Sequence, residues 1–335
     1  MTQAHLTLRI LSLLLSISCH SRAQTPAYRF LTGKAQGTTY HISYRPTTDT
    51  LPSIRFDSIL LSVDKSLSLY DSSSLICAFN RSTHGIRMDA HMRVVITHSL
   101  ALSASSKGAF DITVKPVMDA WGFGAHTVTQ VPTRRMIDSL KRIIGYRHLI
   151  VRNDSLLKDD PAIRIDCNGI AQGYTVDLLS ASLMNAGISD YLVELGGEIR
   201  LQGLNPAGLP WYVGIEDPAL DRIPHMNGRI QPGSGAITTS ANHRNLRSIQ
   251  GRMIGHVMDP RTAMPASQSV LSVCISAADA TTADALDNTC MVLGVRKSLR
   301  WLRRFKGAEM RMVYRNRYGR MRIKTSKGFP PVQGV

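Results

Sequence analysis

Residues 166–203, DCNGIAQGYTVDLLSASLMNAGISDYLVELGGEIRLQG, carry the clearest structural pattern in the chain. Their apolar side chains first recur at the spacing of a helix with one buried face. The pattern predicts a helix that begins at Asn168, whose side chain can cap it, and ends before Gly187. A strand over residues 191–201 is expected next. Its Gly196-Gly197 pair predicts a bulge or a close backbone approach by a ligand.

The start of this helix combines a feature that attracts phosphate with one that repels it. Free N–H groups and the helix dipole favour an anion, and Gly169 and Gly173 leave room for a ligand or another backbone. The carboxylate of Asp166 repels an anion unless a cation lies between them. This conflict suggests a metal and nucleotide site, and the alternative is a helix that serves only as scaffold.

The composition favours a large exported protein. A chain of 335 residues with 43% hydrophobic content can bury a core of one large domain or of two interlocked lobes. At the N-terminus, Arg9 precedes a short apolar run and then small residues, which predicts a signal peptide over residues 1–23. Cleavage after Ala23 and lipidation at Cys19 are both open. Lipidation would associate the protein with the membrane.

The net charge of +16 is concentrated near the C-terminus, where Glu309 is the only acidic residue between Arg296 and Lys327. Residues 309–324 alternate as a β-hairpin, which predicts one solvated face of arginines. Attraction to anionic lipid head groups is the alternative reading. Export argues against nucleic acid as a partner.

Residues 108–124, GAFDITVKPVMDAWGFG, form an unusual loop in which Asp111 stands between apolar residues. Trp121 and Phe123 lie on its flexible end. Aromatic side chains on a loop can stack on a planar ring system, or they can pack a corner of the core. The segment alone leaves both open.

A second polar group lies near the C-terminal half of the chain. Three consecutive hydroxyl residues, 238–240, end a predicted strand, and His256 lies near the end of another. Asp284 and Asn288 lie four apart on a predicted helix. A carboxylate, an amide oxygen and backbone carbonyls suit Mg²⁺, which leaves positions for substrate phosphates, so phosphoryl chemistry is indicated. Histidine clusters for zinc and the common nucleotide-binding motifs GxxxxGK[ST] and GxGxxG are absent from the sequence.

Seven motifs then occur in order over nearly the whole mature chain: QGTTY, GAFDITVKPVMDAWGFG, DCNGIAQGYTVD, YLVELGGEIRLQG, TTSANHR, HVMDPRTAMPA and ADALDNTCMVLG. Together they resemble the FAD:protein FMN transferase (ApbE) family. The resemblance implies one such domain over residues 28–330, on the periplasmic side of the cell membrane. It also implies a Mg²⁺-dependent enzyme that splits FAD, attaches FMN through a phosphodiester to a Thr or Ser of a redox protein, and releases AMP. Acceptors would resemble subunits of the sodium-pumping NADH:quinone reductase (Nqr) or of Rnf-type complexes.

The irregular alternation of helices and hairpins, with no repeated strand–helix–strand unit, predicts an α+β fold with mixed or antiparallel sheets and flanking helices. The ApbE resemblance adds two lobes around a flavin-binding cleft. It also implies the following FAD contacts: Gln36, Ala109, Phe110, Asp111, Asp166, Gln172 and Met258. The implied Mg²⁺ ligands are the Gly169 carbonyl, Asp284 and Asn288.

Three of these positions depart from the family pattern, which often has Met at Gln36, Lys at Gln172 and Thr at Asn288. The change at Asn288 predicts a weaker affinity for Mg²⁺. For the general base that the acceptor hydroxyl needs, His256 is the first candidate and Asp284 or Asp111 the second. Two alternatives to transfer stay open: an FAD pyrophosphatase that releases free FMN, and an exported carrier that binds FAD without cutting it.

Overall fold

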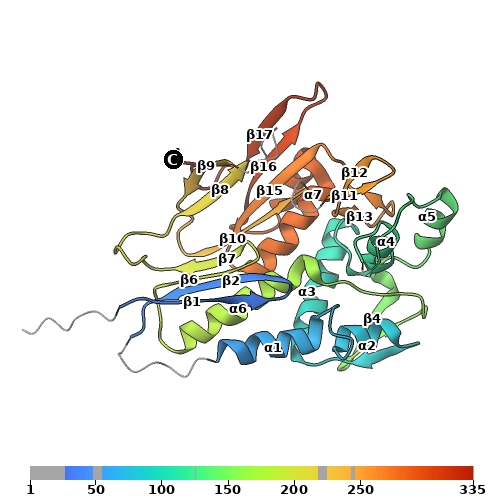
Figure 1. Cartoon of the computed structure of the whole chain (residues 1–335), viewed down its shortest axis with the longest axis horizontal. Helices are drawn as coiled ribbons and strands as arrows, with labels where there is room; N and C mark the ends of the chain where they lie inside the picture. The colour runs from blue at the N-terminus through green and yellow to red at the C-terminus, as the bar shows by residue number, and fades with distance from the viewer. Residues whose placement is uncertain (1–26, 48–54, 125, 218–224, 243–245, 335) are drawn as a thin grey trace, which may run out of the picture.

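A computed structural model describes residues 27–47, 55–124, 126–217, 225–242 and 246–334 (Figure 1). Its main feature is an eight-stranded sheet in the order β1-β2-β6-β7-β10-β15-β16-β17, in which neighbouring strands pair antiparallel. Helices flank this sheet, so the predicted α+β class is confirmed. The expected signal peptide, with Cys19, lies outside the described residues.

The strands of the large sheet are β1 (Arg29–Ala35), β2 (Thr38–Tyr44), β6 (Tyr191–Leu195), β7 (Glu198–Gln202), β10 (Gly235–Ala241), β15 (Val270–Ala277), β16 (Glu309–Arg315) and β17 (Met321–Thr325). Smaller sheets are formed by β3 (Gly85–Arg87), β4 (Leu149–Arg152) and β5 (Ser155–Lys158), by β8 (Val213–Asp217) and β9 (His225–Ile230), by β11 (Leu246–Ile249) and β12 (Arg252–Gly255), and by β13 (Met258–Asp259) and β14 (Met264–Pro265).

The helices are α1 (Phe56–Leu67), α2 (Leu75–Arg81), α3 (Ala90–Ser106), α4 (Lys115–Ala120), α5 (Arg134–Leu140), α6 (Asn168–Asn185) and α7 (Ala280–Leu302), with short 3₁₀ turns η1 (Ile112–Val114) and η2 (Tyr146–His148). In the described part of the chain, none of these helices is both long and apolar enough to cross a membrane.

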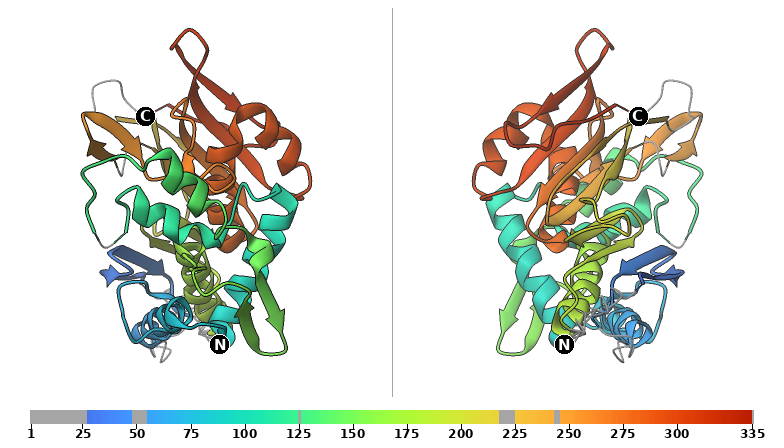
Figure 2. Two further views of the ribbon diagram at one scale, coloured as in Figure 1. Left: turned by 90° about the vertical axis from the view of Figure 1, so that its right-hand side faces the viewer. Right: turned by 90° about the vertical axis from the view of Figure 1, so that its left-hand side faces the viewer.

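Two helices cover one face of the large sheet. Helix α6 packs on β6 and β7, α7 packs on β10 and β15, and the two helices pack on each other (Figures 1 and 2). Helices α1 and α3 lie against α6 on its outer side, and the main hydrophobic core fills the space between these layers. The α6–α7 pair is therefore at the centre of the molecule.

A second, smaller apolar cluster packs separately from the main core. It contains Val117, Trp121, Ile144, Ile249, Ile254, Met258 and Ala263. These residues come from α4, the segment after α5, the β11–β12 hairpin and the β13–β14 turn. The main core and this smaller cluster are thus packed separately, and the candidate site lies between them.

The segment over residues 191–201 differs from its prediction. Two strands, β6 and β7, form a tight hairpin, and Gly196 and Gly197 are its two turn residues with φ of 68° and 111°. A two-residue hairpin turn of this kind needs positive φ at both positions, which glycine adopts without strain. The predicted single strand with a bulge is wrong, because a glycine pair in a β-rich stretch also encodes a turn.

Helix α6 begins at Asn168 and ends before Gly187, as predicted, but its side-chain cap is not the predicted one. Asn168 lies inside the helix, and its N–H donates to Oδ1 of Asp166 at 2.9 Å, so Asp166 rather than Asn168 supplies the side-chain acceptor. Gly187 follows the helix with φ of 76°, and the N–H of Ile188 donates to the carbonyl of Leu183. The predicted glycine end of the helix is confirmed.

The predicted C-terminal hairpin is present as β16 and β17. Its arginines do not form a single solvated face, because Arg311 is buried where β16 lies between β15 and β17. The other arginines of the hairpin are exposed.

Candidate active site

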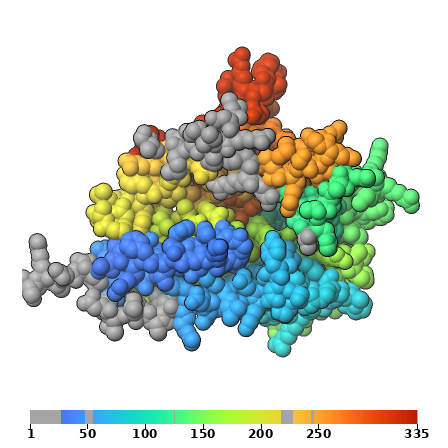
Figure 3. Space-filling model, in the orientation of Figure 1, coloured from blue at the N-terminus to red at the C-terminus, as the bar shows by residue number. Residues whose placement is uncertain are grey.

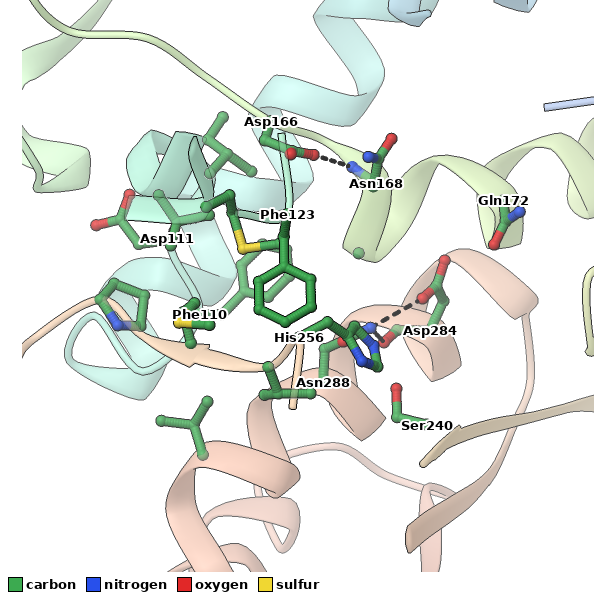
Figure 4. A pocket seen from close by; sticks show the side chains of 18 of the residues that line it. Phe110, Asp111, Phe123, Asp166, Asn168, Gln172, Ser240, His256, Asp284 and Asn288 are labelled. Carbon is green, nitrogen blue, oxygen red and sulfur yellow. Dashed lines mark hydrogen bonds between the residues drawn. The ribbon is translucent and has the colours of Figure 1, made fainter. Parts of the chain in front are cut away.

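The sequence-predicted residues meet at one cavity of about 370 Å³ between α6, α7, the loop that contains Phe110 and the turn that contains His256 (Figure 4). All predicted site residues except Gln36 line it: Ala109, Phe110, Asp111, Asp166, Gly169, Gln172, His256, Met258, Asp284 and Asn288. Segments far apart in the sequence therefore form one site. The individual roles of these residues stay predictions.

Gln36 lies in an adjoining cavity of about 270 Å³, which shares Tyr70, Asn168 and Gln172 with the first. It occupies the β1–β2 turn with φ of 51°, and its Nε2 donates to Oγ1 of Thr175 on α6 at 2.7 Å. The two cavities together form an elongated site along the N-terminal part of α6.

The predicted metal ligands are neighbours across the α6–α7 contact. Oδ1 of Asp284 accepts from Nδ2 of Asn288 at 3.1 Å, and Oδ2 accepts from the N–H of Gly173 at 3.0 Å. A Cβ placed on Gly169 would lie 3.4 Å from Cγ of Asn288. Gly169, Asp284 and Asn288 are therefore neighbours, and their role as metal ligands stays a prediction.

The two helices approach each other closely at Gly173. A Cβ at this position would lie 2.2 Å from the carbonyl oxygen of Ala280 and 2.8 Å from Cβ of Asp284. Both distances are too short for any side chain. The missing side chain of Gly173 thus allows α7 to bring Asp284 against α6.

Asp177, one turn further along α6, fixes the start of α7. Its Oδ1 accepts from the N–H of Ala280 at 3.0 Å, and its Oδ2 accepts from the N–H of Thr281 at 2.8 Å. An ion pair with Arg200 of β7 holds the same carboxylate. Sequence reasoning missed Asp177, although it continues the four-residue spacing of Gly169 and Gly173 along one helix face.

Burial and a neighbouring carboxylate both disfavour the ionised form of the acidic residues of α7. Burial raises the pKa of Asp284 well above its usual range, and the nearby Asp287 raises it further. Asp287 is also fully buried, and its Oδ1 accepts from Oγ of Ser240 at 2.9 Å. A cation next to Asp284 would offset both effects.

The donor set fits a hard cation rather than zinc. Among the described residues, no group of three or more His, Cys, Asp and Glu side chains is arranged to hold a metal. An ion at Asp284 would therefore need the amide oxygen of Asn288 and a backbone carbonyl such as that of Gly169. Nδ2 of Asn288 faces Asp284 at present, so the amide would turn to present its oxygen, and its two ends are nearly equal in size.

On the opposite wall, Asp111 holds the loop together. Its Oδ1 accepts from the N–H of Thr113 at 2.9 Å, and its Oδ2 accepts from the N–H of Tyr146 at 2.6 Å. Burial raises the pKa of Asp111 despite these bonds. Its oxygens are thus engaged in shaping the loop beside Phe110.

The two aromatic residues of this loop have different environments. Trp121 is buried, and its Nε1 donates to the carbonyl of Ala263 at 3.0 Å, so it packs in the smaller core. Phe123 lines the cavity, with its ring centroid 6.4 Å from that of His256 in an edge-to-face arrangement. Of the two open readings, packing describes Trp121, and Phe123 is available to a ligand.

Two further groups line the cavity: Tyr70, which the sequence prediction missed, and Ser240, the last of the three hydroxyl residues that it singled out. Tyr70 lines both cavities and is 84% exposed, at their junction. Ser240 lines the first cavity, with Asp287 behind it. The polar sequence around Tyr70 did not predict that this residue lines the cavities, because its position next to Asn168 depends on the fold.

Comparisons with known proteins identify the family to which the chain belongs. The model of the ApbE family matches residues 36–312. The FAD:protein FMN transferase of Vibrio cholerae is 34% identical over 86% of this chain and 87% of its own length, and that of Escherichia coli K12 is 35% identical over 82% and 81%. Among solved structures, flavin transferase ApbE from Vibrio cholerae has a TM-score of 0.81 at 31% identity, covering 90% of this chain and 98% of its own. The apo form of Pseudomonas stutzeri flavinyl transferase ApbE has a TM-score of 0.79 at 32% identity, covering 90% and 95%.

Proposed function

Because this chain belongs to the ApbE family, we propose that it is an FAD:protein FMN transferase whose active site is the cavity between α6 and α7. In this proposal the enzyme splits the diphosphate of FAD, attaches FMN to a Thr or Ser hydroxyl of an acceptor protein, and releases AMP. The observation that supports it is the contact of Asp284 with Asn288, which lie beside Gly169 at the N-terminus of α6.

The size and shape of the site support FAD as the substrate. A dinucleotide is elongated, and the two cavities of about 370 and 270 Å³ meet at Tyr70, Asn168 and Gln172. Phe123 and Tyr70 offer aromatic surfaces for planar rings. Asn168, the first residue of α6, lines both cavities, and the positive end of the helix dipole there suits the diphosphate.

Mg²⁺ would be held by Asp284, the amide oxygen of Asn288 and the Gly169 carbonyl. When bound, it would neutralise negative charge on the diphosphate. Asp284 supplies the charge for this binding, and Gly173 and Asp177 keep it in place. Because an amide replaces the usual hydroxyl at position 288, we expect a modestly weaker affinity for Mg²⁺.

His256 is the best candidate for removing the proton of the acceptor hydroxyl. It lines the cavity and is only half-buried, so an acceptor can reach it. The oxygens of Asp111 are engaged by backbone N–H groups, and Asp284 is assigned to the metal. Histidine is also the side chain that most often serves as a general base.

The acceptor we propose is an exported redox subunit of the Nqr or Rnf type. The enzyme would meet this acceptor on the periplasmic side of the membrane after export. Cys19 would be the site of a lipid anchor if the protein is lipidated. The family resemblance of the motifs supports this, together with the signal-like pattern of residues 1–23.

One incubation separates transfer from its alternatives. The protein is mixed with FAD, Mg²⁺ and a candidate acceptor subunit, and the products are resolved by gel fluorescence and chromatography. Flavin fluorescence on the acceptor, with stoichiometric AMP, supports transfer. Free FMN without labelled acceptor would show an FAD pyrophosphatase, and intact FAD would show a carrier.

A further inference from the structure

The C-terminal hairpin, β16 with β17, lies in the segment that carries most of the chain's excess positive charge. Between Arg296 and Lys327, thirteen residues are Lys or Arg and only Glu309 is acidic, so this segment has a net charge of +12 out of +16. The hairpin projects from the body of the molecule (Figures 1 and 3). It is also remote from the predicted active-site residues, none of which belongs to it.

The outer half of the hairpin carries exposed cations on both of its faces. Its exposed cations are Arg315, Arg317, Arg320, Arg322 and Lys324. Neighbouring residues of a strand point to opposite faces, yet Arg322 and Ile323 are both exposed, so neither face of this half is covered. Among the described residues, none of the five cations forms an ion pair with a carboxylate.

The tip is an ordered turn with an aromatic residue at its end. Oδ1 of Asn316 accepts from the N–H groups of Tyr318 and Arg320, at 2.9 and 3.1 Å. Tyr318 is 70% exposed, and the guanidinium of Arg317 lies over its ring at 4.7 Å. Ile323 adds an apolar side chain that is 53% exposed. Arginine next to exposed tyrosine and aliphatic side chains is typical of the membrane–water interface.

We propose that this hairpin is a docking surface for the anionic head groups of a phospholipid bilayer. A convex element cannot enclose a small ligand, but it can place cations on both faces among lipid phosphates. Because the turn is fixed by hydrogen bonds, little backbone order has to be gained on contact. The surface would orient the enzyme on the membrane independently of the transferase chemistry and of any lipid on Cys19.

Vesicle sedimentation tests the proposal with the full chain. The probes are vesicles of phosphatidylcholine alone and of phosphatidylcholine with phosphatidylglycerol. We expect binding only to the anionic vesicles, with a steep loss as salt is raised. Replacing three cations, in R317Q/R320Q/R322Q, should weaken this binding about a hundredfold. Y318A should weaken it less, because it removes only an interfacial ring.

The matched control removes three exposed arginines elsewhere, in R134Q/R135Q/R142Q at α5. It should lower binding far less than the hairpin triple variant, and both should melt at the wild-type temperature. Equal losses in the two triple variants would mean a diffuse charge effect and would overturn the proposal. Absence of binding to the anionic vesicles, or equal binding to neutral ones, would overturn it as well.

Discussion

The two walls of the active-site cavity are built in different ways. The α6–α7 wall is polar and fixed by buried contacts, because Gly173 leaves no room between the helices and Asp177 holds the start of α7. The facing wall belongs to the smaller apolar cluster around Trp121 and Met258, which packs separately from the main core. The α6–α7 wall thus holds the predicted metal-binding carboxylate of Asp284, and the facing wall offers the aromatic ring of Phe123.

This contrast predicts how variants should behave. Changes on the α6–α7 wall should remove the chemistry. On the facing wall, changes of the apolar residues around the proposed base His256 should mainly weaken substrate binding.

The largest effect is expected from Asp284→Ala. This variant removes the only carboxylate among the predicted metal ligands, so turnover should fall by about 10³-fold or more. Rates should be measured over a range of Mg²⁺ concentrations, with the melting temperature as a check on folding. Full activity at low Mg²⁺ would remove the metal assignment.

Gly173→Ala should come next. Its Cβ would lie 2.2 Å from the carbonyl oxygen of Ala280, so α7 must shift, and the free energy of unfolding should fall by about 1–3 kcal/mol. Activity should fall more than stability alone explains, because Asp284 moves with α7. Gly334→Ala is the control, since nothing lies near its added methyl group. A variant at Gly173 with normal Mg²⁺ dependence would show that helix spacing does not set the site.

Asp177→Ala should separate positioning from stability. It removes two acceptors at the start of α7 and the ion pair with Arg200, at a cost of about 2 kcal/mol. Asp89→Ala removes the N-cap of α3, where Oδ1 accepts from the N–H of Met92 at 2.8 Å, and should cost about 1 kcal/mol. Only the Asp177 variant should bind Mg²⁺ more weakly, measured by calorimetry in the presence of FAD. Equal Mg²⁺ affinities in both variants would contradict the positioning role.

The smallest effect is expected on the facing wall. Phe123→Leu keeps an apolar side chain but removes the ring next to His256, so KM for FAD should rise about threefold to tenfold with kcat nearly unchanged. Phe305→Leu is the control, because Phe305 packs on Trp301 away from the cavity. A large fall in kcat for Phe123→Leu with KM unchanged would contradict this binding role.

Local patterns in the sequence predicted the long helices and the C-terminal hairpin, because helix and strand periods are short-range signals. They did not resolve Gly196-Gly197 as a turn, since two glycines in a β-rich stretch suit a bulge equally well. The site residues were predicted through motif resemblance. Tyr70 and Asp177 were missed because their roles arise from contacts over long sequence separations, which no local pattern contains.

The central claim is that one divalent ion is held by Asp284, Asn288 and Gly169 at the diphosphate of FAD. The most direct test is anomalous scattering from crystals grown with FAD and Mn²⁺ in place of Mg²⁺. We predict a single strong peak in direct contact with the Asp284 carboxylate, the Asn288 amide oxygen and the Gly169 carbonyl, and its loss in Asp284→Ala. A peak elsewhere in the cavity, or bound FAD with no peak at these residues, would contradict the claim.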